Sequence, residues 1–145
     1  MKRLLPRAGV LAILLAVPAA LPAANAQSVI GRWNTQKQGG IVEIHRCGEA
    51  LCGRVVDGAP LRANPDQRDV NNPNKALRDR KLLGARVLHG FTGGPRVWKG
   101  GPVYDPETGD GANSGVLTLA DANTLKVKGC IAAFLCRTQT WKRVR

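Results

Sequence analysis

The stretch "IVEIHRCGEALCGRVVD" (residues 41–57) has the pattern of two short strands joined by a turn. In its first half, Val42 and Ile44 alternate with polar residues, which is the period of two expected of a half-buried strand. Glu43 and His45 share the opposite face. "GEA" then interrupts the pattern, and "LCGRVVD" returns as a partner strand. The stretch therefore predicts an antiparallel β-hairpin with a possible disulfide across its end.

Similar short segments occur on both sides of this hairpin. Gly100-Gly101 interrupts one of them and suggests a bulge or bend. In another, Leu125 and Val127 alternate with lysines, so Lys126 and Lys128 are expected to point outward. The expected strands cover residues 31–36, 41–47, 51–57, 82–91, 96–105, 116–119, 125–130 and 137–145. About eight antiparallel strands can close into a barrel that leaves no exposed edge, so the predicted fold class is an all-β barrel.

Residues 58–80 differ from the rest of the chain because they contain three prolines and many polar residues. They are expected to form one long loop with a short helical turn near residues 74–80. Asn72-Pro73 is the expected start of that turn, since Asn caps helices and Pro fits the first helical position.

The first residues resemble a secretory signal peptide. Lys2, Arg3 and Arg7 precede an apolar run at residues 10–17, and Ala24-Asn25-Ala26 follows as a small-residue cleavage site. The run is shorter than the roughly 20 residues of a membrane span, and no second run follows it. We expect residues 1–26 to be a signal peptide cleaved after Ala26, and residues 27–145 to be one periplasmic or secreted domain without a transmembrane segment.

The remaining chain is basic. The first 26 residues hold three of the 22 basic residues and none of the ten acidic ones, which leaves a formal charge of +9. Such a charge favours weak attraction to polyanions and says nothing about the fold. The basic residues are scattered, and aromatic residues are few, so a specific nucleic-acid site is not expected.

Four cysteines lie in this part of the chain: Cys47, Cys52, Cys130 and Cys136. Export favours disulfides, and four cysteines allow three pairings. We favour Cys47–Cys52 and Cys130–Cys136, because each pair is close in sequence and can close across a turn. The spacings differ from the usual zinc knuckle, so no metal or other cofactor is expected.

The stretch "VWKGGPVYDPETGDG" (residues 97–111) could be an ion-binding loop or a turn between strands. A calcium loop would require a ligand where Gly109 stands and a glycine where Asp110 stands. The turn interpretation fits better, since Asp105-Pro106 can start a reversal and Gly109 and Gly111 can supply positive φ.

The sequence contains no recognisable catalytic motif. No nucleophile elbow surrounds Ser28 or Ser114. Asp69, Asp105 and His45 remain as possible acid–base residues of a hydrolase or isomerase, and this interpretation is the least favoured. A role other than catalysis is therefore favoured, and enzymatic activity stays open.

Several motifs together resemble a known family: "GRW", "IVEIHRCGEALCGRVV", "DVNNPNKALRDRKLLGARVLHGF", "VWKGGPVYDPETG" and "LKVKGCIAAFLCRTQTWKRV". They are similar to the bacterial domain of unknown function family 2147, a group of small exported proteins with a lipocalin-like (calycin) barrel. The chain departs from the family at residues 109–112, where a Lys and a Tyr are replaced. The resemblance implies that Gly31 and Trp33 close one barrel end beneath a basic residue, for which Arg143 is the first candidate and Lys142 the second.

Two functions are weighed on this basis. The favoured one is binding of a small apolar or amphipathic molecule inside the barrel. Trp33, Phe91, Trp98 and Tyr104 would supply the apolar wall. Glu43, His45 or Arg86 would orient a polar head. The alternative is an interaction protein whose basic surface contacts an anionic envelope component or a protein partner.

N-terminal sequencing of the exported protein tests the signal peptide. We expect the mature chain to begin at Gln27. An exported protein that retains Met1 would contradict this prediction.

Overall fold

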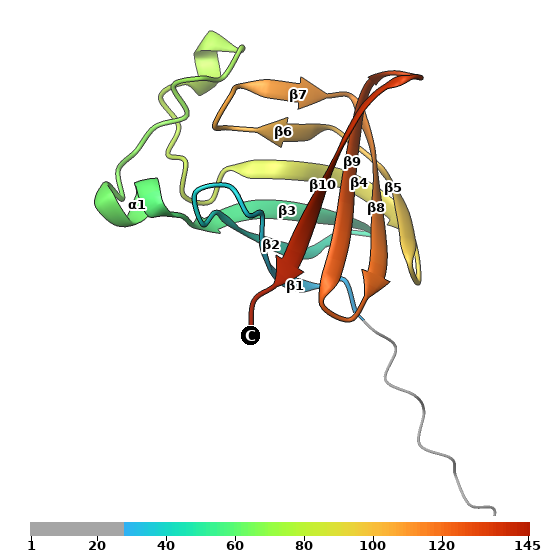
Figure 1. Cartoon of the computed structure of the whole chain (residues 1–145). Coiled ribbons are helices and arrows are strands. Elements are labelled where there is room, and N and C mark those ends of the chain that lie inside the picture. Colours follow the sequence, from blue (N-terminus) through green and yellow to red (C-terminus); the bar gives the residue numbers. More distant parts are fainter. Residues whose placement is uncertain (1–27) are drawn as a thin grey trace, which may run out of the picture.

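The structure is a computed structural model that describes residues 28–145. The expected signal peptide lies outside these residues. Within these residues, the chain forms ten strands and two short helical segments (Figure 1). The strands are β1 (Gly31–Asn34), β2 (Ile41–Cys47), β3 (Ala50–Asp57), β4 (Arg86–Gly93), β5 (Val97–Gly100), β6 (Val103–Asp105), β7 (Asp110–Ala112), β8 (Ser114–Asp121), β9 (Thr124–Ala132) and β10 (Leu135–Arg143).

Eight of these strands form a closed antiparallel barrel. Their order is β3-β2-β1-β10-β9-β8-β5-β4, and pairing of β3 with β4 closes the ring. The predicted all-β, eight-stranded barrel is therefore confirmed. Figure 1 shows β8, β9 and β10 running across the direction of β2, β3 and β4, as expected for a strongly twisted sheet that closes on itself.

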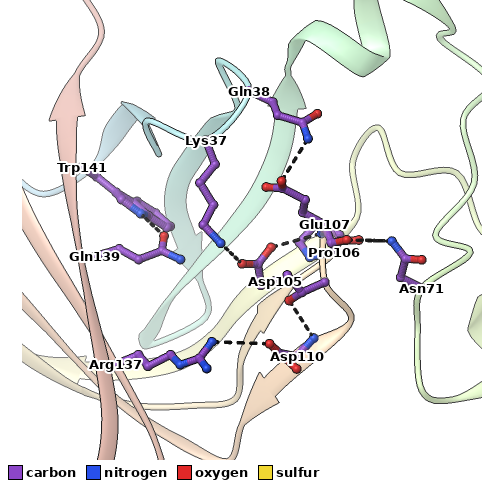
Figure 2. A network of polar contacts seen from close by, with 11 residues as sticks. Lys37, Gln38, Asn71, Asp105, Pro106, Glu107, Asp110, Arg137, Gln139 and Trp141 are labelled. Atoms are coloured by element: carbon purple, nitrogen blue, oxygen red, sulfur yellow. Dashed lines mark hydrogen bonds and ion pairs between the residues drawn. The ribbon is translucent and has the colours of Figure 1, made fainter.

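The remaining hairpin, β6–β7, extends the barrel wall. β5 and β6 are separated by a break at Gly101 and Pro102, and both pair with β4. The predicted interruption of the 96–105 strand is therefore present. β6 and β7 pair with each other, and their turn lies beside the loop that joins β1 to β2 (Figure 2).

The hydrophobic core lies inside the barrel. Inward-facing residues of all eight barrel strands are buried, among them Ile44, Leu88, Phe91, Leu117 and Leu125. On β9, Leu125 and Val127 are buried, whereas Lys126 and Lys128 are exposed. The period-two pattern thus assigned the inner and outer faces of this strand correctly.

One end of the barrel is closed around Trp33, which is 0% exposed. The Arg143 guanidinium lies over its ring, 4.2 Å from the centroid. Arg143 also donates to the carbonyls of Ala122, Ile30 and Ser28. It therefore joins the segment before β1 to the turn between β8 and β9. Lys142, the second candidate for this position, donates instead to Thr124 Oγ1.

Gly31 is part of the same closure. Its φ of +133° is unfavourable for other residues, and a Cβ added there would lie 2.9 Å from the Arg143 guanidinium. This geometry explains the spacing Gly-x-Trp. Gly31 leaves room for the Arg143 guanidinium, which covers the ring of Trp33.

Two local features differ from the predictions. The strand expected at residues 82–91 begins only at Arg86, and the apolar residues before it belong to a bend. A short helix, α1 (Ala59–Ala63), begins at Gly58 in a segment expected to be loop, with a proline in its first turn.

The short helical turn expected near residues 74–80 is present, but its start differs from the predicted one. The 3-10 helix η1 (Lys75–Leu77) is capped by Asn74, whose side chain accepts from Ala76 N, rather than starting at Asn72-Pro73. The side chain of Asn72 accepts from Asn74 N instead.

Both favoured disulfides are present. Cys47–Cys52 spans the β2–β3 hairpin and Cys130–Cys136 spans the β9–β10 hairpin. Among residues 28–145, no helix has the length and apolar character needed to span a membrane.

Replacement of Arg143 by Gln should destabilise the barrel by about 2 kcal/mol, since it removes a partly desolvated cation–π contact and charge-assisted hydrogen bonds. Urea unfolding of the oxidised protein measures this loss. R145Q, a matched change at an exposed position, should alter stability by less than about 0.5 kcal/mol. Equal effects of both changes would contradict the role assigned to Arg143.

Candidate functional site

The other half of the barrel encloses a cavity of about 1000 Å³. Small-molecule sites typically measure about 300–1,000 Å³, so the barrel interior is open and not packed solid with side chains. Its inner wall is mainly aliphatic and comes from strands around the ring, from β6, from α1 and from the bend before β4. The apolar residues of this wall are Ile41, Val42, Val55, Leu61, Leu82, Val87, Leu88, Val103 and Val127, and Trp141 adds an aromatic surface.

Polar side chains surround the mouth of the cavity (Figure 2). We call this group the mouth network; its members are Lys37, Gln38, Asn71, Asp105, Glu107, Asp110 and Arg137. They come from the β1–β2 loop, the long loop, the β6–β7 turn and β10. Polar residues from four separate segments therefore surround the mouth of an apolar cavity.

Two contacts connect the β1–β2 loop to the β6–β7 turn across the mouth. Lys37 Nζ donates to Asp105 Oδ2 at 2.7 Å, and Gln38 Nε2 donates to Glu107 Oε1 at 2.9 Å. The hydrogen bond to Asp105 raises the pKa of Lys37, so its ammonium group stays charged. Such partly exposed contacts contribute about 1 kcal/mol or less each, so they can separate at little cost.

The β6–β7 turn is also held from its other sides. Asn71 Nδ2 donates to the carbonyl of Glu107 at 2.8 Å, and Arg137 lies 3.6 Å from Asp110. Gly109 has a φ of +79°, and a Cβ there would lie 2.1 Å from the carbonyl oxygen of Asn71. The turn interpretation of residues 97–111 is thus confirmed at Gly109, whereas Gly111 lies in β7 without positive φ.

Behind the cavity wall, a buried polar cluster fixes the long loop to β6. The Asp69 side chain is 0% exposed and pairs with Arg80 at 2.7 Å. It also accepts from Tyr104 at 2.6 Å and from Asn72 at 2.8 Å. These donors satisfy both carboxylate oxygens, as burial of a charge requires. Asp69 therefore fixes the position of Tyr104, whose ring lines the cavity.

Among the candidate ligand residues, only Tyr104 lines the cavity. Trp33, Phe91 and Trp98 are buried in the core. Glu43 faces outward and pairs with Arg54, whose hydrogen bond lowers the pKa of its carboxyl group.

His45 shares the outer face of β2 with Glu43, and Arg86 is exposed beside His89. The three residues considered for acid–base chemistry, Asp69, Asp105 and His45, do not meet in one site.

One group of potential metal-ligating atoms occurs among the described residues, formed by Cys47, Cys52 and His89. Cys52 Sγ lies 3.3 Å from His89 Nδ1. The two sulfur atoms are bonded to each other, so neither is a thiolate, the form that binds metal.

Comparison with known proteins gives one family and one similar fold. The profile of a family described as uncharacterized protein conserved in bacteria (DUF2147) matches residues 31–143. No curated protein matches the chain. The solved structure of protein HP1028 from Helicobacter pylori, which belongs to the lipocalin family, is similar to the structure of this chain. The TM-score is 0.70 and the sequence identity is 22%, and the match covers 81% of this chain and 84% of that chain. At this identity, the likeness concerns the fold alone.

Tyr104 allows a direct test of the buried cluster, because it is the only tyrosine of the chain. Burial raises the pKa of its phenol, and the hydrogen bond to Asp69 raises it further. We expect the phenolate absorbance of the folded protein to appear at higher pH than that of the urea-unfolded protein, which should titrate near pH 10.

The same shift sets a dependence of stability on pH. The contribution of Tyr104 is complete below the pKa of the unfolded chain, about 10, and falls as pH rises further because the unfolded state ionises first. Y104F should therefore reduce this alkaline loss of stability. A folded protein whose phenol titrates like the unfolded one would contradict the described environment of Tyr104.

Proposed function

The chain belongs to the DUF2147 family and folds as a lipocalin-like barrel, and we propose that it binds a small amphipathic molecule in the barrel cavity. The single observation that carries this proposal is the open, apolar interior with polar residues at its mouth. The apolar part of the molecule lies against Val87, Val127 and Trp141. Its polar end lies among the residues of the mouth network.

The size and chemistry of the cavity support this assignment energetically. Burial of a methylene group contributes about 0.8 kcal/mol, so a chain of about ten would contribute roughly 8 kcal/mol before the costs of association. The costs of association are subtracted from this gain, so the net affinity of such a chain is weaker than the burial figure alone would give. The mouth network supplies donors and acceptors that add to this affinity and select the polar end.

We also propose that the protein works in the periplasm or outside the cell. Two disulfides among the described residues support this, because such bonds persist in oxidising compartments.

A variant that fills the cavity tests the ligand site. Val103 is partly buried, lines the cavity and lies against Gly115 and Gly129 of the wall. A larger side chain there must extend into the cavity. We expect V103W to weaken the binding of Nile red, an apolar fluorescent probe, at least about tenfold by fluorescence titration.

The matched control is V97W, because Val97 is on the outer face and 43% exposed. It should bind Nile red like the unchanged protein. The thermal midpoints of both variants show that they are folded. Equal affinity in V103W and the unchanged protein would place the probe outside the cavity and contradict the proposal.

Native mass spectrometry of the protein from its own cell envelope, followed by a denaturing measurement, identifies the natural ligand. We expect an additional mass in the native spectrum that disappears on denaturation.

A further inference from the structure

The β9–β10 hairpin ends in an exposed apolar segment, "IAAFL" (residues 131–135), which we call the hairpin tip. Phe134 is 83% exposed, Ile131 66% and Leu135 52%. Single exposed apolar residues are common on proteins, but a contiguous group of large ones marks an interaction site. The tip projects beyond the neighbouring strands at the upper right of Figure 1.

The hairpin tip is held in place by the disulfide between Cys130 and Cys136, which flank it. A loop restrained in this way loses little conformational entropy when it binds, so more of its apolar burial appears as affinity. Ile131, Phe134 and Leu135 also line the mouth of the cavity. The tip therefore adjoins the entrance to the ligand site.

A group of lysines lies on the outer wall beside the tip. Lys126 and Lys128 are exposed on β9, the strand that leads into the tip. Lys99 of β5 lies in the same cross-strand row as Lys128, with Val116 between them. None of these three lysines forms an ion pair with a described residue. Arg137, one residue after the disulfide that flanks the tip, pairs with Asp110.

We infer that the hairpin tip docks on the surface of an anionic phospholipid bilayer. Phe134, Leu135 and Ile131 enter the boundary between headgroups and acyl chains, where amphipathic segments bury their apolar side chains. Lys99, Lys126 and Lys128 contact the anionic headgroups. The charge of this wall complements an anionic surface and gives no advantage on a neutral one. Docking in this position places the cavity mouth beside the bilayer, from which an amphipathic molecule can enter.

Vesicle co-sedimentation tests the docking with the full mature, oxidised protein. The probes are vesicles of equal parts phosphatidylglycerol and phosphatidylcholine, with vesicles of phosphatidylcholine alone for comparison. We expect binding to the anionic vesicles at low salt, and its loss at high salt because the charges are then screened.

Two sets of variants separate the apolar and the electrostatic contributions. F134S/L135S should weaken binding to the anionic vesicles at least about tenfold. K126Q/K128Q should weaken it by roughly fivefold per lysine. The matched controls are V70S, at a residue that is 61% exposed outside the tip, and K75Q, in η1. Both controls should bind like the unchanged protein.

A tryptophan at the tip reports insertion directly. F134W should show a blue shift of its emission with anionic vesicles and none with phosphatidylcholine vesicles. All substituted side chains are exposed, so the variants should keep the thermal midpoint of the unchanged protein.

Three results would overturn the inference. The first is equal binding of F134S/L135S and the unchanged protein. The second is no binding of the unchanged protein to anionic vesicles. The third is a dimer in sedimentation without lipid that F134S abolishes, because the occupant of the tip would then be a second copy of the chain. None of these results bears on Nile red binding in the cavity, so the ligand proposal is tested separately.

Discussion

The structure depends on the contact between the Arg143 guanidinium and the ring of Trp33. These residues are register partners on β1 and β10, so their contact reinforces the pairing that joins the first strand of the ring to the last. The same guanidinium binds carbonyls of the segment before β1 and of the β8–β9 turn. Gly31 provides the space for it. Because this end is closed, the cavity of the described barrel has its mouth at the opposite end.

The two ends of the barrel differ in the kind of interaction that closes them. Around Trp33, buried aromatic surface and several hydrogen bonds donated by the Arg143 guanidinium hold the end closed. At the mouth, the β1–β2 loop and the β6–β7 turn meet through contacts such as Lys37 with Asp105, which solvent partly screens. A rigid closed end and a weakly closed mouth would allow the proposed ligand to enter without loss of the fold. The polar cluster around Asp69 holds Tyr104 and the long loop together beside the mouth.

The strands were largely predictable because their signal is local. Alternation of Leu125 and Val127 with lysines, for instance, requires no knowledge of the partner strand. The helix α1 was missed because five residues carry too little periodicity. The cavity wall was not predictable, since it depends on which inward side chains lie near the mouth and which near Trp33. Lys37 and Asp105 meet although they are 68 positions apart, and no local pattern indicates that contact. Glu43 alternates along β2 with the buried residues Val42 and Ile44. That alternation already indicated that Glu43 lies on the outer face of the barrel and not in its cavity.

The pairing of β1 with β10 has a consequence for how the chain folds. Both disulfides join neighbouring strands, with sequence separations of 5 and 6, so neither brings distant parts of the chain together. The β2–β3 and β9–β10 hairpins can form early and independently, whereas the ring cannot close until its last strand has been synthesised. Closure over such a sequence separation is slow compared with hairpin formation. During synthesis, Trp33 therefore has no Arg143 to cover it until the last strand is complete.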